Sequence, residues 1–450
     1  MQKKYNKDTY CHSAMHSFSL HSNGRTRPCC VSKVHTSKFM PGTDVQLYPA
    51  YSSNPDHYQV ANNIEEFVND DSLKQIRKQM LNGEKPDACK ECFNLEEKGI
   101  KSFRQLHNDD HIEDIDTTLE NINQDGSIDI KAINYLDVTL GNVCNLKCRT
   151  CNPWASHSWL DEAPTVPHNE FTKTTYIVSK MSSQNPWFLQ AFETGFFNEV
   201  LPNISTINFL GGEPLVVKEH YAWLEKIVEM GYAKNITLQY NSNGTTIPKK
   251  ILDVWKSFKQ IVLSLSIDAV DELAYYVRHP SKWHVIQRNV GKLAIYTRTN
   301  SNLSVQTHVT LSSLNIHALP KIIAWCGQNY KTWNHIDKSD NNNWRHHGYE
   351  NFLPHFNIVE RPYNMHMCHI PDNVKSDLCK MLDDLYTSLK NSSIPEWEKH
   401  SLENILNLKN IINQPRSEKE WNNFLDNTKA SDKFRNVNIT DYVPWIKECM

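Results

Sequence analysis

The chain lacks the long apolar runs and the excess of positive charge that would point to a membrane or to nucleic acid. No segment of its 450 residues approaches the roughly 18 consecutive apolar residues of a transmembrane helix. The N-terminal stretch MQKKYNKDTYCHSAMHS is charged and polar, without the apolar core of a secretory signal peptide. The formal net charge of −3 gives no electrostatic reason for sequence-independent binding to nucleic acid. We therefore expect a soluble, cytoplasmic protein with no membrane partner.

Cysteine is also scarce, and its distribution is uneven. Only 12 of the 450 residues are cysteine, yet three of them stand within eight positions, in VCNLKCRTCNP at 143–153. In the reducing cytoplasm, clustered thiols indicate metal binding or catalysis before they indicate disulfides. A second group comprises Cys11, the pair Cys29-Cys30 and the segment CKEC at 89–92. The remaining cysteines are scattered, and we expect them to be small buried side chains.

Short β-rich runs alternate with helical patterns from residue 132 onward, as expected for a parallel sheet built from βαβ units. The expected strands are 132–140, 205–210, 235–240, 260–267, 303–311 and 355–359. The helical patterns between them include 216–231, 282–297 and 317–328. About six units predict an α/β fold with an open, partial (βα)6 parallel barrel, whose active site lies at the carboxyl ends of the strands.

Four regions are expected along the chain. Residues 1–104 form a cysteine-rich N-terminal domain, and residues 105–131 form an acidic, polar linker punctuated by Gly and Asn. Residues 132–360 form the partial barrel. Residues 361–450 have a polar helical pattern and form a C-terminal extension.

The three closely spaced cysteines allow more than one interpretation. Positions i, i+4 and i+7 share one stripe of a helix, so core packing is one of them. The flanking residues, Gly141-Asn142 before and Asn152-Pro153 after, are typical of a loop instead. A structural zinc site normally needs four ligands, and no fourth stands at nearby spacing. Three thiolates can hold three irons of a [4Fe–4S] cluster and leave the fourth iron open to a substrate or cofactor.

The CxxxCxxC spacing of Cys144, Cys148 and Cys151 resembles the signature of the radical S-adenosylmethionine (SAM) superfamily, which lies in the loop after the first barrel strand. The resemblance implies that these cysteines hold a [4Fe–4S] cluster whose open iron chelates the amino and carboxylate groups of SAM. It implies further that SAM is cleaved reductively to a 5′-deoxyadenosyl radical, which abstracts a hydrogen atom from a substrate. The residue before the third cysteine is commonly aromatic in this family. Here it is Thr150, which weakens an expected contact with the adenine.

Other segments fit the same resemblance, each at an expected strand end. GGEP after the second strand is similar to the motif that holds the SAM amino group, and NSNGT after the third resembles a TNGT segment. SLSID after the fourth offers hydroxyl and carboxylate groups where the family binds the ribose and the SAM carboxylate. Each segment alone is also an ordinary turn, but together they occur in the family's order. The residues expected to contact SAM are Gly211, Gly212, Glu213, Pro214, Ser242, Asn243, Ser266, Asp268 and an arginine matching one that several members direct at the SAM carboxylate, Arg278.

The N-terminal cysteines, in GRTRPCC and CKEC, resemble the auxiliary-cluster modules of this superfamily, called SPASM or twitch. Those modules usually follow the barrel, whereas here the module precedes it, as in some twitch-type members. The resemblance implies an auxiliary [4Fe–4S] cluster held by Cys11, Cys29, Cys89 and Cys92, with Cys30 as a neighbour. A zinc knuckle is the alternative for the CxxC pair.

These features predict a radical SAM enzyme that modifies a peptide or protein side chain with the help of an auxiliary cluster. The resemblance implies an external electron donor such as flavodoxin or ferredoxin. The alternative substrate is a nucleotide, sugar or other small metabolite. A non-catalytic iron–sulfur or zinc-binding protein is a third hypothesis, but holding a cluster alone does not require the GGEP and SLSID segments.

Overall fold

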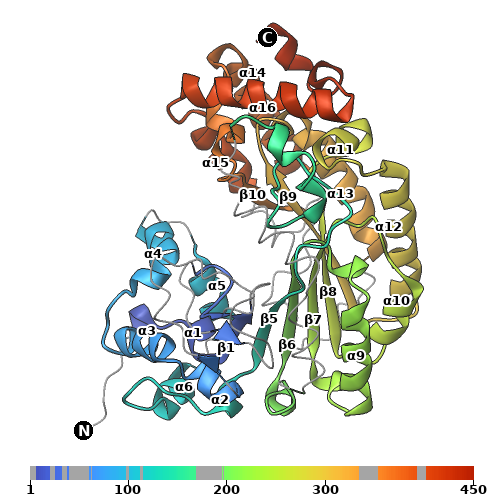
Figure 1. Ribbon diagram of the computed structural model, residues 1–450. Helices are drawn as coiled ribbons and strands as arrows, with labels where there is room; N and C mark the ends of the chain where they lie inside the picture. The colour runs from blue at the N-terminus through green and yellow to red at the C-terminus, as the bar shows by residue number, and fades with distance from the viewer. Residues whose placement is uncertain are drawn as a thin grey trace.

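An open sheet of eight strands, in the spatial order β10-β9-β8-β7-β6-β5-β1-β2, dominates the computed structural model (Figure 1). The structure describes residues 7–20, 26–32, 38–39, 60–61, 63–97, 101–111, 115–168, 195, 197–333, 353–392 and 402–449. The strands of this sheet are β1 Ser17–Leu20, β2 Thr26–Arg27, β5 Tyr135–Thr139, β6 Thr206–Leu210, β7 Thr237–Ser242, β8 Gln260–Ser266, β9 Leu303–Leu311 and β10 His355–Ile358. A separate two-stranded sheet pairs β3 Lys38–Phe39 with β4 Val60–Ala61.

The α/β fold predicted from the sequence is confirmed, and the sheet does not close into a barrel. Each of the six expected strands is present, and all adjacent pairs from β1 to β10 are parallel. The short β2 is antiparallel to β1. The strand β1 was not expected, and it extends the parallel sheet beyond β5 by pairing Ser17 with Tyr135 and Leu20 with Val138.

Helices cover one side of the sheet, as βαβ connections require. Figure 1 shows α9, α10, α12 and α13 along that side. These helices are α9 Glu219–Glu229, α10 Lys249–Trp255, α11 Asp271–Val277, α12 Trp283–Thr297 and α13 Leu319–Trp333. Because side chains alternate along a strand, Leu136 and Val138 of β5 enter the apolar core while Asp137 points to the opposite face. There Asn208 of β6 donates to the buried Asp137 carboxylate at 2.7 Å.

The N-terminal residues pack against the β1 edge of the sheet rather than forming a detached unit (Figure 1). Their helices are α1 His12–His16, α2 Ile64–Val68, α3 Asp71–Leu81, α4 Lys90–Glu97, α5 Phe103–Asp110 and α6 Ile115–Asn121. The segment expected to be a linker, 105–131, contains most of α5 and all of α6, with residues 112–114 outside the described part. A capping box at Ser102 and Gln105 starts α5. The Asn108 side chain then accepts from the His12 backbone N–H and donates to the Tyr10 carbonyl, both at 2.8 Å. Polar residues in this segment therefore bind the N-terminal backbone.

The C-terminal region is helical, as expected, and comprises α14 Asp372–Lys390, α15 Glu403–Ile412 and α16 Glu418–Arg435. In Figure 1, α14 and α16 lie beyond the end of the sheet from which the cysteine-bearing loop emerges. Asn436 ends α16 in the left-handed conformation, with φ of 52°. Within the described residues, no helix is both long enough and apolar enough to cross a membrane.

Candidate active site

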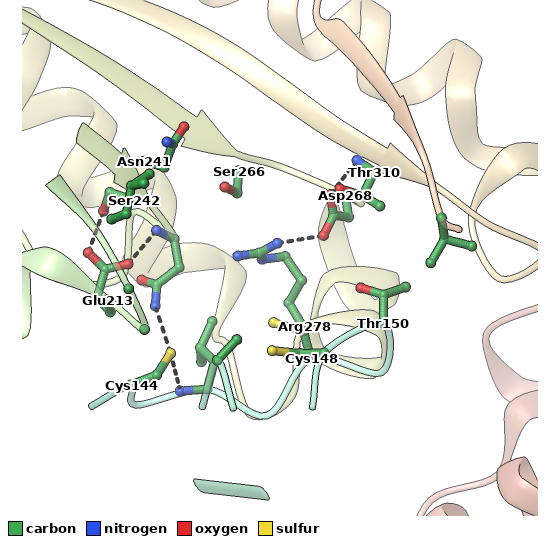
Figure 2. A pocket seen from close by; sticks show the side chains of 18 of the residues that line it. Cys144, Cys148, Thr150, Glu213, Asn241, Ser242, Ser266, Asp268, Arg278 and Thr310 are labelled. Atoms are coloured by element: carbon green, nitrogen blue, oxygen red, sulfur yellow. Dashed lines mark hydrogen bonds and ion pairs between the residues drawn. The ribbon is translucent and has the colours of Figure 1, made fainter. Parts of the chain in front are cut away.

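A cavity of about 370 Å³ opens at the carboxyl ends of the parallel strands, lined by the loop after β5 and by residues at the ends of β6 to β10 (Figure 2). Almost every residue expected to hold the cluster or SAM lies on its wall. These are Cys144, Cys148, Cys151, Gly211, Gly212, Glu213, Ser242, Asn243, Ser266, Asp268 and Arg278. Pro214 does not line the cavity and instead begins a short 3-10 helix behind Glu213, Pro214–Val216.

The cysteine loop is irregular, so the alternative of three cysteines on one helical stripe is wrong. The Cys144 backbone is fixed on both sides, because its N–H donates to His157 Nδ1 at 3.1 Å and its carbonyl accepts from Ser158 Oγ at 2.7 Å. The Leu146 N–H lies 3.4 Å from Cys144 Sγ, where it can donate to a thiolate. Burial raises the pKa of the Cys144 thiol to about 11 and that of Cys151 to about 12.

Gly211 and Gly212 allow two loops to meet backbone to backbone. The Gly212 N–H donates to the Gly141 carbonyl at 3.0 Å, and the Glu213 N–H donates to the Val143 carbonyl at 2.9 Å. A Cβ on Gly211 would lie 2.6 Å from Gly141 O, and one on Gly212 would lie 2.4 Å from Val143 O. Gly211 also has φ of 131°, which favours glycine. The two glycines therefore seat the start of the cysteine loop against the end of β6.

We expect Gly212→Ala to push these loops apart, because the added Cβ meets backbone that has no room to move. The cost should be roughly 1–3 kcal/mol of unfolding free energy, as for other overpacked sites. Gly291→Ala is the matched control, since a Cβ at this helical position meets nothing within 4 Å. Thermal unfolding of the two variants checks the expectation. Equal stability of the two variants would contradict the assigned role of Gly212.

Glu213 joins the GGEP segment to the NSNGT segment, as Figure 2 shows. Its carboxylate accepts from Ser242 Oγ at 2.8 Å and from the Asn243 and Leu215 N–H groups at 2.6 and 3.1 Å. The side chain is only 1 % exposed, and burial raises its pKa to about 6. Asn243 in turn donates to Asn145 Oδ1 at 2.9 Å and lies 4.0 Å from Cys144 Sγ. Glu213 therefore supports the wall that faces Cys144.

Asp268 and Arg278 form an ion pair on the other wall of the cavity, with Arg278 Nη1 2.5 Å from Asp268 Oδ2. The second Asp268 oxygen accepts from the Thr310 N–H at 2.7 Å. In Figure 2 the Arg278 guanidinium points into the space between Asp268 and Ser242. Its Nε is buried and makes no hydrogen bond within the described protein. A buried donor of this kind suits an anionic ligand group such as a carboxylate.

The N-terminal cysteines lie outside this cavity and gather near one another. Cys89 interacts electrostatically with Cys11, Cys29 and Cys92, although these residues come from separate parts of the chain. Cys30 instead hydrogen-bonds to Asp137 on β5. Cys29 thus interacts with Cys11 and Cys89, whereas Cys30 interacts with Asp137 and with its neighbour Cys29. Residues 24 and 25 of the GRTRPCC motif lie outside the described residues.

The three cysteines of the cavity were expected to hold an iron–sulfur cluster rather than a single metal ion. In the described part of the chain, no three His, Cys, Asp or Glu side chains are placed to hold a single metal ion. Cys144, Cys148 and Cys151 line one cavity, and the Leu146 N–H lies near the Cys144 sulfur; three thiols are the protein ligands of a [4Fe–4S] cluster with one open iron. The chemistry of this donor set, three thiols on the wall of one cavity, therefore fits the cluster.

Sequence reasoning missed four polar residues of the wall: Asn241, Thr310, Glu360 and Arg361. Asn241 is part of NSNGT, in which only Ser242 and Asn243 were predicted to contact SAM. Glu360 and Arg361 directly follow the last expected strand, so the strand-end argument could have found them. Thr310 lies inside β9, and no feature of the sequence distinguishes it.

Neither a protein-family model nor a curated protein matches this sequence. Its structure is similar to crystal structures of Streptococcus suis SuiB. For SuiB bound to S-adenosylmethionine the TM-score is 0.29 at 13% identity, covering 57% of this chain and 45% of that one. For SuiB bound to the precursor peptide SuiA the TM-score is 0.27 at 13% identity, covering 65% and 51%. The match thus spans about half the length of the SuiB chain. These likenesses are too distant to transfer the role of any residue.

Proposed function

We propose that this protein is a radical SAM enzyme, with a [4Fe–4S] cluster on Cys144, Cys148 and Cys151 and SAM beside it. The observation that carries the proposal is the convergence of three thiols, a buried carboxylate and a partly buried arginine on one cavity at the strand ends. When bound, the cluster would supply the electron that cleaves SAM reductively, giving a 5′-deoxyadenosyl radical that abstracts a substrate hydrogen atom.

Different side chains of the protein are proposed to bind the cluster and the SAM carboxylate. The three thiolates ligate iron, and the Leu146 N–H and Asn243 amide stabilise negative charge on Cys144 Sγ. Arg278, oriented by Asp268, presents its unpaired Nε to the SAM carboxylate. Because the Arg278 guanidinium already pairs with the Asp268 carboxylate, we assign Asp268 chiefly to this orienting role.

We assign the binding of the SAM ammonium and ribose groups to the remaining polar side chains of the cavity wall. Glu213 places a carboxylate near Cys144, and a carboxylate attracts an ammonium group. The Ser266 hydroxyl at the end of β8 lies between these two walls, where it can bond to the ribose (Figure 2). Thr150 lines the same cavity and offers a methyl and a hydroxyl group to the adenine in place of an aromatic ring.

We expect Glu213→Gln to weaken SAM binding by about tenfold or more, because a charge-assisted hydrogen bond contributes about 1.5–3 kcal/mol. Gln keeps the size of Glu, and its one oxygen can still accept from the Ser242 hydroxyl and the Leu215 N–H, which share Oε1 of Glu213. Only the bond from the Asn243 N–H is lost, so the iron content should stay unchanged. Glu225→Gln, on the exposed face of α9, is the matched control and should bind SAM normally. Equilibrium binding of SAM to the iron-loaded variants checks this. If Glu213→Gln bound SAM with wild-type affinity, Glu213 would have only a structural role in holding the two loops together.

For the substrate we propose a peptide or protein side chain, supported by the second group of cysteines, which we assign to an auxiliary [4Fe–4S] cluster on Cys11, Cys29, Cys89 and Cys92. The electron would come from an external donor such as flavodoxin or ferredoxin. A small metabolite is the alternative substrate. Deuterium transfer from labelled peptides into 5′-deoxyadenosine would support the peptide, whereas transfer only from labelled nucleotides or sugars would refute it.

A further inference from the structure

The peptide groups on both sides of Cys148 are held by the end of α11 and the residues after it. The Lys147 N–H donates to the His279 carbonyl at 2.7 Å, and the Arg149 N–H donates to the Val277 carbonyl at 2.8 Å. Cys148 therefore lies in a short irregular segment whose flanking N–H groups are both bonded to backbone carbonyls of residues 277 and 279. The C-terminal helix α16 contacts the same segment.

The first contact with α16 is an ion pair between Arg149 and Asp432. The Arg149 Nε also donates to the Tyr276 carbonyl at 3.1 Å, and its guanidinium lies 3.7 Å from the centre of the Tyr276 ring. The Tyr276 hydroxyl donates to Asp432 at 3.0 Å, and the other Asp432 oxygen accepts from the Ile439 N–H at 2.7 Å. Arg149 is 2 % exposed and Asp432 8 % exposed, so this network is largely buried.

The second contact comes from Arg435, the last residue of α16. Its Nε donates to both oxygens of Glu162 at 2.9 and 2.8 Å, and its Nη2 donates to the Lys147 carbonyl at 2.9 Å. Glu162 is completely buried, and Lys147 Nζ lies 3.5 Å from it. Arg435 also interacts electrostatically with Cys148. One guanidinium thus both holds the peptide before Cys148 and adds positive charge near its sulfur.

We infer that Arg435 and Asp432 are positioning residues for the cysteine loop, and that the Arg435–Glu162 pair adjusts the charge felt at Cys148. A buried ion pair often stabilises a fold no more than well-packed apolar side chains of similar volume would. A contribution to folding stability therefore does not by itself explain why two buried ion pairs lie beside Cys148. The part of the inference that concerns the cluster rests on the proposed function. The part that concerns the loop does not.

Removing Arg435 and removing Glu162 should shift the reduction potential of the cluster in opposite directions. Positive charge near a cluster favours the reduced, more negative form and raises the reduction potential. Arg435→Gln leaves the Glu162 carboxylate without its main partner, so the potential should fall. Glu162→Gln leaves the Arg435 cation uncompensated, so the potential should rise. The double variant loses both charges and should return close to the wild-type value.

The first experiment is an EPR-monitored redox titration of these three variants as full-length, anaerobically reconstituted protein, following the signal that a Cys144→Ala variant lacks. Opposite shifts in the single variants, with recovery in the double variant, are expected. Shifts of the same sign, or no shift, would overturn the electrostatic role. If Arg435→Gln does not fold, the double variant and Glu162→Gln still decide the sign.

The second experiment measures hydrogen exchange of the amides in residues 147–151 and needs no cluster. Asp432→Asn and Arg435→Lys each remove contacts to the loop, so exchange should speed up about tenfold or more. Lys409→Gln is the control, because its ion pair with Asp383 lies on exposed surfaces of α15 and α14. Unchanged exchange in both loop variants would overturn the positioning role. A wild-type chain without the Cys144-dependent signal would refute the proposed function, while the exchange rates would still decide whether α16 holds the loop.

Discussion

Replacing Cys144, Cys148 and Cys151 together with Ala is expected to abolish the formation of 5′-deoxyadenosine from SAM. The same variant should lose about four of about eight irons per chain, because the three thiols supply all the protein ligands proposed for one [4Fe–4S] cluster. The walls formed by Glu213 and Arg278 remain, but nothing is left to deliver the electron. Iron analysis and chromatography of the products after chemical reduction measure both effects.

The control for this variant is Cys379→Ala. Cys379 lies on α14, away from both groups of cysteines, with the Asn413 amide 3.6 Å from its sulfur. Its replacement should change neither the iron content nor SAM cleavage. If the triple variant still produced 5′-deoxyadenosine, the assignment of the cluster would be refuted.

Replacing Cys89 and Cys92 with Ala is expected to lower iron by about four per chain and to leave SAM cleavage without substrate intact. Formation of the modified product should fall, because this cluster is proposed to assist the reaction rather than to cleave SAM. Metal loss should also loosen the N-terminal residues locally, since thiols far apart in sequence are gathered at one place. Iron analysis, the SAM cleavage assay and proteolysis of the N-terminal region check these effects.

Cys30→Ala is the matched control for this second variant. Cys30 stands next to a proposed ligand but bonds to Asp137, so its loss should leave the iron content unchanged. Loss of iron in Cys30→Ala would reverse the choice between Cys29 and Cys30. Tightly held zinc in the wild-type chain after anaerobic reconstitution with iron would show that the N-terminal cysteines form a structural site instead.

The sheet was largely predictable from the sequence, because each strand from β5 to β10 is a compact β-rich run separated from the next by a helical pattern. The exception is β1, in the serine-rich segment at 17–20. Its place in the sheet depends on pairing with β5, more than a hundred residues later, and no local pattern reports such a pairing. The helix α5 was not predicted for a related reason, since a polar side chain such as that of Asn108, which the sequence suggests is solvated, bonds to the backbone of the distant residues Tyr10 and His12.

The candidate site was predictable where a short motif carries its residues. CxxxCxxC, GGEP, NSNGT and SLSID all lie around the cavity, because the carboxyl ends of parallel strands meet at one edge of the sheet. The roles of individual residues were less predictable. The N–H groups of Gly212 and Glu213 are already used between loops, and Asp268 is bound by Arg278 and Thr310. The support from α16 joins residues far apart in the chain, so no spacing in the sequence could indicate it.

The most direct test of the central claim uses the unmodified protein. The anaerobically reconstituted chain is incubated with SAM, with and without dithionite, and 5′-deoxyadenosine and methionine are quantified by mass spectrometry. The account predicts that both products appear in equal amounts and only with the reductant. Intact SAM in the presence of dithionite, in a preparation whose Cys144-dependent cluster is fully loaded, would contradict it.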